Sequence, residues 1–175
     1  MELNNLVRAA IFCALAIGMG FSLMLVPNIE LITVIVFMSG LMLGWRWGAL
    51  VGGTAIFIYS GLNPMGSGLS FPPLFFMQIL SMSITGFIGG LFKNFFLKKE
   101  TNMISLIGLG FLGFICTFVY DFLTLISYPL SAGLGFPGII AALVKGIGFT
   151  LLHEISNSII FVVTVPNVIR YLKSR

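Results

Sequence analysis

The sequence is poor in charged residues. Of its 175 residues, 8% are Asp, Glu, Lys or Arg and 58% are hydrophobic, and the mean hydropathy is +1.12. Soluble domains carry roughly a quarter charged residues. A water-soluble globule with so few charges would expose more apolar surface than solubility allows. The shortage excludes such a domain, and we expect an integral membrane protein whose solvent is the lipid bilayer.

Histidine and cysteine are also scarce, with one His and two Cys. In "LLHEISNS" the only histidine, His153, begins a run in which Asn157 stands where the His-Glu-x-x-His motif of zinc proteases has its second histidine. Cys13 and Cys116 fall in different apolar segments, which indicates neither a disulfide framework nor a metal pair. The sequence has neither a Gly-x-Ser-x-Gly elbow nor a Gly-x-x-x-x-Gly-Lys-Ser/Thr loop. We therefore expect no enzyme, no metal and no cofactor, and any ATPase must be another polypeptide.

Gly, Pro and charge clusters divide the chain into six apolar segments, each a candidate membrane span. These are 6–26, 29–44, 47–62, 72–97, 104–128 and 138–167. The second and third are short and are joined by "GWRWG", which predicts a tight or tilted hairpin. The prediction is an all-α protein with one six-helix transmembrane domain over residues 1–175.

The basic residues predict the orientation of these segments. An even number of spans puts both termini on one side of the membrane, and the side richer in Lys and Arg is cytoplasmic. Only Lys145 falls off that face, and the other basic residues are Arg8, Arg46, Lys93, Lys98, Lys99, Arg170, Lys173 and Arg175. We expect both termini inside. The net charge of +4 reflects this bias and attraction to anionic lipid, and no basic patch with interleaved aromatics indicates nucleic acid.

The two loops expected on the outer face are uncharged and rich in Gly, Pro and Ser. They are "GLNPMGSGLSFPP", residues 61–73, and "SYPLSAGLGFPG", residues 127–138. These residue types favour turns. The loops either cover a cavity as lids or simply connect helices.

Polar residues recur at helical spacing on the last three segments, so each segment carries a polar stripe. The stripes are Gln78, Ser81 and Thr85 on the fourth; Thr117, Asp121, Thr124 and Tyr128 on the fifth; and Lys145, Phe149 and Ser156 on the sixth. His153 and Asn157 lie roughly 80–120° around the sixth helix from Lys145. Three helices could thus face a common polar interior.

Asp121 and Lys145 are the most informative members of these stripes. An ionisable side chain in hydrocarbon costs at least ~2.5–3.5 kcal/mol, so it faces a partner or a wet cavity. The two lie at similar depth, and they either form an ion pair between helices or bind a polar group of a ligand. Glu30, after "PN", is a weaker candidate at the outer start of the second segment.

The other polar residues of the last segment leave two interpretations open. His153 and Asn157 either hydrogen-bond a ligand at the cavity floor or hold helices together. Glu154 projects about 100° from His153 and needs a donor or a proton of its own.

Small residues gather on the first segment, where Ala10 and Ala14 form a small-x-x-x-small pair in "RAAIFCALAIGMGFS". Such pairs let another backbone approach closely. The pair serves either packing within the bundle or contact with a partner subunit.

The chain resembles the substrate-binding S components of energy-coupling factor (ECF) transporters. The resemblance is carried by the six segments, the Ala10/Ala14 pair, "PNIELITVIVFMSGLMLGWRWGALVGG" and the ending "LLHEISNSIIFVVTVPNVIRYL". It implies a protein of the prokaryotic plasma membrane that binds a water-soluble vitamin near the outer face, enclosed by helices 4 to 6 and the outer loops. It also implies partners: a transmembrane coupling subunit, which the alanine pair contacts, and two cytoplasmic ATPases.

The resemblance implies ligand contacts that overlap the polar stripes. The implied contacts are Asn63, Gln78, Asp121, Tyr128, Lys145, Phe149 and His153. Together with Glu30 and Asn157 they form the candidate site, and no motif identifies the vitamin. Two rival functions remain: a proton-coupled carrier using Asp121, His153 or Glu154 as a proton relay, and a structural membrane protein that binds no small molecule.

Overall fold

The structure is a computed structural model that describes residues 2–98 and 102–173. Two of the basic residues used to predict the orientation, Lys99 and Arg175, lie outside this range. Every regular element in the described part of the chain is a helix. These are α1 (Glu2–Leu23), α2 (Ile32–Leu43), α3 (Trp45–Gly61), the 3-10 turn η1 (Gly68–Ser70), α4 (Pro72–Leu91), α5 (Lys93–Lys98), α6 (Met103–Ser131) and α7 (Gly135–Lys173). The predicted all-α class is confirmed.

Four of these helices, α1, α4, α6 and α7, are long and apolar enough to cross a membrane. Helix α2 is a shorter apolar helix of 12 residues, and α3 has 17. The six-span count and the orientation therefore stay predictions. The helix bounds need correction at two predicted segments: 72–97 is two helices, α4 and α5, and 138–167 is part of α7, which begins at Gly135 and continues through Pro166 to Lys173.

The chain turns after α4 because α5 is tied to the end of α2. The Lys93 side chain donates a hydrogen bond to the backbone carbonyl of Met42, 3.0 Å away. The last carbonyls of a helix have no partner within it, and a cation satisfies them well. Hydropathy extends across residues 72–97 without showing this turn, which explains the error in the predicted segment.

Helix α2 lies at the centre of the molecule. All residues from Ile32 to Leu41 are buried, and the helix packs against α1, α3, α4 and α7. A helix that is apolar all round is a buried one. It is joined to α3 by a single residue, Gly44, whose φ of +97° is one that glycine adopts without strain. The predicted tight hairpin is confirmed.

Glycines let the backbones of α2, α3 and α4 touch. A Cβ atom added at Gly86 of α4 would overlap the carbonyl of Gly48 in α3, and one added at Gly40 of α2 would overlap the carbonyl of Gly86. Farther along, a Cβ at Gly52 would overlap the carbonyl of Met82. Close backbone approach of this kind holds membrane helices together where lipid removes the hydrophobic driving force.

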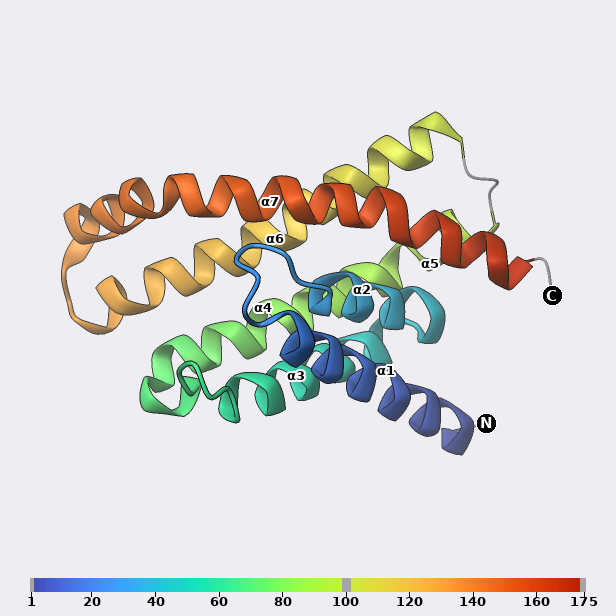
Figure 1. Cartoon of the computed structure of the whole chain (residues 1–175), viewed down its shortest axis with the longest axis horizontal. Coiled ribbons are helices and arrows are strands. Elements are labelled where there is room, and N and C mark those ends of the chain that lie inside the picture. The colour runs from blue at the N-terminus through green and yellow to red at the C-terminus, as the bar shows by residue number, and fades with distance from the viewer. Residues whose placement is uncertain (1, 99–101, 174–175) are drawn as a thin grey trace.

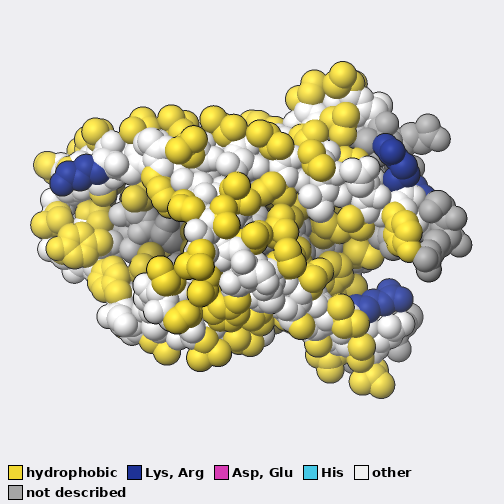
Figure 2. Space-filling model, viewed as in Figure 1, with side chains coloured by type: hydrophobic (Ala, Val, Ile, Leu, Met, Phe, Trp, Pro, Cys, Tyr) yellow, Lys and Arg dark blue, Asp and Glu magenta, His cyan; other side chains and the backbone are white. Residues whose placement is uncertain are grey.

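The two ends of the molecule are formed by different parts of the chain (Figure 1). The described ends of α1 and α7 lie near each other at one end of the long axis, and the α3–α4 and α6–α7 connections lie at the other. The α1–α2 loop, residues 24–31, stops part-way along this axis, over the middle of the bundle. In the face shown in Figure 2, basic side chains lie toward the two ends and the flank between them is mostly apolar. This distribution suits a protein that crosses a bilayer along its long axis.

Candidate functional site

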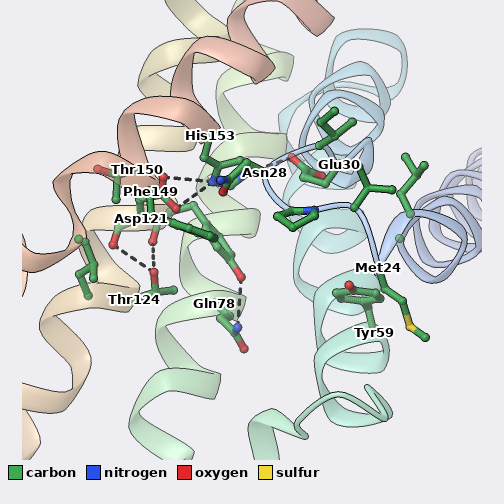
Figure 3. A pocket seen from close by; sticks show the side chains of 18 of the residues that line it. Met24, Asn28, Glu30, Tyr59, Gln78, Asp121, Thr124, Phe149, Thr150 and His153 are labelled. Carbon is green, nitrogen blue, oxygen red and sulfur yellow. Dashed lines mark hydrogen bonds and ion pairs between the residues drawn. The ribbon is translucent and has the colours of Figure 1, made fainter.

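A cavity of about 440 Å³ lies between the α1–α2 loop and helices α3, α4, α6 and α7 (Figure 3). We call it the central cavity. Its floor and walls combine apolar and polar side chains. The polar lining residues are Asn28, Glu30, Tyr59, Gln78, Tyr120, Asp121, Thr124, Thr150 and His153.

The central cavity contains a cluster of three ionisable side chains, Glu30, Asp121 and His153. His153 Nδ1 lies 3.0 and 3.1 Å from the two carboxylate oxygens of Asp121, which places a proton between the ring and the carboxylate. On the other side of the ring, Nε2 lies 3.9 Å from Glu30 Oε1. Asp121 and His153 are both buried. Helices α6 and α7 are therefore joined at the cavity by a charge-assisted contact, and the imidazole bridges toward the α1–α2 loop.

Glu30 is held in place by two donors. The backbone N–H of Thr33 donates to Oε2 at 2.9 Å, and Asn157 Nδ2 donates to Oε1 at 2.9 Å. The first contact satisfies one of the free N–H groups at the start of α2. The turn before it depends on Asn28, whose φ of +60° is left-handed and is tolerated better by asparagine than by most residues. The side chain of Glu30 is thus fixed at the cavity edge by its own helix and by α7.

A second chain of hydrogen bonds crosses the opposite wall. Ser60 donates to Gln78 Oε1 at 2.5 Å, and Gln78 Nε2 donates to the hydroxyl of Tyr120 at 3.1 Å. The Tyr120 ring meets the His153 ring edge-on, with centroids 6.4 Å apart. Helices α3, α4, α6 and α7 are thereby linked around the cavity by contacts between side chains.

Five of the nine predicted ligand contacts line the central cavity and four do not. The lining residues are Glu30, Gln78, Asp121, Phe149 and His153. Asn157 is fully buried below the cavity, where it holds Glu30. Asn63 accepts a hydrogen bond from the N–H of Met65 within its own loop, and the exposed Tyr128 packs against Phe71.

The fourth residue outside the lining is Lys145. It is exposed, and within the described part of the chain it forms no ion pair. Of the two alternatives for Asp121 and Lys145, the ion pair between them does not form, and Asp121 pairs with His153 instead. Helical geometry explains the difference: the cavity face of α7 runs through Gly146, Phe149, Thr150 and His153. Lys145 lies about 80° around the helix from His153, off this face.

The loops next to the central cavity are not those that the sequence indicates. No residue of 61–73 or 127–138 lines it, whereas residues of 23–30 do. Of the two alternatives for the Gly- and Pro-rich loops, this arrangement favours simple connection of helices over covering the cavity. Since α2 has only 12 residues, the α1–α2 loop reaches the middle of the bundle and lies beside the cluster of ionisable groups.

In a comparison with known families, residues 4–166 match the family described as the substrate-specific component of an ECF transporter. The chain belongs to this family. The comparisons with curated proteins and with solved structures give no match. The members of the matched family are membrane subunits that bind substrate for transport, and they are not enzymes.

In this ECF substrate-specific component, the alanines of α1 divide between two faces. Ala9 and Ala16 are buried inside the bundle, whereas Ala10 and Ala14 are exposed. The exposed pair lines a shallow apolar groove between α1 and α3 whose other wall includes Trp47. Packing within the bundle therefore does not account for Ala10 and Ala14. Their contact with a partner subunit stays a prediction.

Sequence reasoning missed several lining residues of the ECF component. Tyr120 and Thr150 each precede or follow a predicted contact by one position, and Tyr59 and Asn28 come from elements that carried no polar stripe. Asn28 had one usable signal: it stands after Pro27 and two residues before Glu30, a pattern typical of a turn. The sequence gives no signal that Tyr59 lines the cavity, because a single tyrosine in an apolar helix does not show which residues it contacts.

Glu154 lies on the other side of the α6–α7 pair. It lines a second hollow with the stacked rings of Phe114, Phe118 and Phe122, and this hollow shares Asp121 with the central cavity. Among the described side chains, none donates a hydrogen bond to its carboxylate. Glu154 thus lies outside the lining of the central cavity, and its need for a donor or a proton of its own stays a prediction. No group of three or more His, Cys, Asp and Glu in the described residues is placed to hold a metal ion.

Proposed function

We propose that the chain captures a small water-soluble vitamin or related micronutrient from outside the cell in the central cavity. It hands the molecule to a transmembrane coupling subunit, and two cytoplasmic ATPases drive the cycle. The family supports a substrate-binding membrane subunit. The chemical class of the bound molecule and the identity of the partner subunits are proposals.

The central cavity is the observation that carries this proposal. Its volume of about 440 Å³ falls in the range of small-molecule sites, about 300–1,000 Å³. Ionisable groups within a membrane protein normally face a partner or a wet cavity and mark a substrate path. Here Glu30, Asp121 and His153 meet beside an open volume, and the amide of Asn157 holds Glu30 in place. A purely structural subunit would have no need for that volume.

The small molecules that co-purify with the chain test the proposal. The protein is purified from its native membrane in mild detergent, denatured, and the released compounds are identified by mass spectrometry. We expect one vitamin-like compound, and adding it back should raise the unfolding midpoint. Preparations that release no compound, and that no vitamin stabilises, would contradict the proposal.

The proposed orientation, six spans with both termini inside, predicts which sites are reachable from outside. In a Cys13→Ser, Cys116→Ser background, Met65→Cys in the α3–α4 loop should react with a membrane-impermeant maleimide in intact cells. Lys173→Cys at the end of α7 should react only after permeabilisation. Both side chains are exposed, so the contrast depends on the membrane alone. Labelling of both sites in intact cells would overturn the orientation.

A proton-coupled carrier is the second candidate, because His153 lies between two carboxylates that could pass a proton. The two mechanisms differ in what drives uptake. Uptake of the identified compound should require the ATPases and should survive collapse of the proton gradient. The reverse result would favour the carrier.

A further inference from the structure

The charge of the central cavity narrows the class of molecule that it takes. Two of the described lining residues are acidic, Glu30 and Asp121, and none is a lysine or an arginine. The only basic lining group is the imidazole of His153. Lys145, the basic residue nearest along α7, is exposed and lies off the cavity face.

The cavity stays negative in either state of the histidine. With a proton on both ring nitrogens, the two carboxylates and one imidazolium sum to −1, and with a neutral ring they sum to −2. Both carboxylates act as hydrogen-bond acceptors: Glu30 accepts from Thr33 and Asn157, and Asp121 faces His153 Nδ1 with both oxygens.

The surroundings of the carboxylates strengthen their electrostatic interaction with a ligand. The central cavity lies between helices of the bundle, so water screens the carboxylates less than it would at a surface. The 3.9 Å separation between His153 Nε2 and Glu30 Oε1 is too long for a strong hydrogen bond, so the imidazole does not fully neutralise Glu30. An incoming cation would complete the balance, whereas an anion would meet uncompensated negative charge.

Aromatic rings complete the lining. Tyr59, Tyr120 and Phe149 line the same cavity from three helices. The face of an aromatic ring attracts a cation and stacks on a flat ring. A cavity with paired carboxylates and several aromatic side chains favours a flat molecule that carries positive charge.

We infer that the substrate of this chain is a small aromatic or heteroaromatic cation, with a protonated or quaternary nitrogen that Glu30 and Asp121 hold. This inference rests on the proposed function, since it specifies the ligand of the same cavity. Glu30 reaches the ligand from the α1–α2 loop, and Asp121 reaches it from α6. Neutral and anionic vitamins are disfavoured.

Binding of charge-matched probes to the full-length protein in detergent tests the inference. The probes are thiamine and 1-methylnicotinamide as cations, riboflavin and nicotinamide as neutral molecules, and pantothenate and nicotinate as anions. The compound that co-purifies with the protein is added to this set. We expect the unfolding midpoint to rise with a cation and with no neutral or anionic probe. The co-purified compound should carry positive charge at pH 7.

Two matched variants separate charge from shape. Glu30→Gln keeps the acceptor for the Thr33 N–H, so the start of α2 should fold as before, yet it should weaken cation binding by about tenfold or more. Glu154→Gln makes the same chemical change outside the cavity and should leave the affinity within about threefold.

The outcomes distinguish this inference from the proposal beneath it. A neutral or anionic compound that binds tightly, with the same affinity in Glu30→Gln, overturns the cation inference and leaves the proposed function standing. Absence of any co-purified compound and of any midpoint shift overturns both.

Discussion

Asp121→Ala is expected to abolish the ligand-induced rise in unfolding midpoint while the protein still inserts into the membrane. A ligand at about 100 times its Kd adds roughly 2.7 kcal/mol to the folded state, and that increment should disappear. The substitution removes both contacts to His153 Nδ1, so it removes a carboxylate of the cavity and also releases the ring that faces Glu30. The measurement is a thermal-unfolding curve with and without the co-purified compound.

The same substitution should lower stability without ligand, because it leaves a buried imidazole unpaired, at a cost of about 3–5 kcal/mol. Binding must therefore be compared with each variant's own ligand-free midpoint. Lys145→Ala is the matched control: its side chain is exposed and lies outside the cavity lining, so the full ligand shift should remain. Normal binding by Asp121→Ala would show that the central cavity is not the substrate site.

The contrast between Asp121 and Lys145 shows which features of the site can be predicted from the sequence and which cannot. Helical spacing fixes the angles between side chains on one helix, and it correctly joined Gln78 and Asp121 to stripes that meet at the cavity. Spacing does not fix how each helix is rotated in the bundle. On α7, either the face with Lys145 or the face with His153 could point into the cavity. The free-energy cost of placing an ionisable side chain in hydrocarbon applies to both residues, so it does not distinguish the two faces. Only the packing of α7 against α6 decides it.

The position of Glu30 could not be predicted from the sequence for a different reason. The start of the second segment was expected near residue 29, which would have left Glu30 at the outer edge of a membrane span. In the structure α2 begins at Ile32, and the short helix places residues 24–31 over the middle of the bundle. The contact between Glu30 and Asn157 joins residues 127 positions apart in the chain. No local pattern predicts a contact at that separation.

The glycines had a readable pattern. Gly48 and Gly52 in α3, and Gly86 and Gly90 in α4, are each four residues apart. Glycines at this spacing lie on one helical face and allow close helix packing in membranes. The same rule applies to Ala10 and Ala14, which lie on the outer surface of α1. The two glycine pairs predict the close contact between α3 and α4, and Gly40 of α2 packs against the same part of α4.

Gly86→Ala should cause a large loss of stability, because Gly86 stands where α2, α3 and α4 meet. A Cβ there would overlap the carbonyl of Gly48, and backbone atoms cannot move aside as a flexible side chain can. Overpacking costs about 1–3 kcal/mol, and a rigid neighbour favours the upper end. For a chain of this length about 3 kcal/mol corresponds to a fall of roughly 6–12 °C in unfolding midpoint. Thermal unfolding in detergent measures it.

Gly148→Ala is the control for that experiment, since it makes the same change within α7. A Cβ at Gly148 has no atom within 4 Å. The midpoint should stay the same or rise slightly, because alanine favours a helix over glycine by about 1 kcal/mol. If Gly86→Ala were as stable as Gly148→Ala, the backbones of α3 and α4 would not be in contact. The walls of the central cavity contributed by Tyr59 and Gln78 would then be less firmly positioned than the structure indicates, because both stand on these two helices.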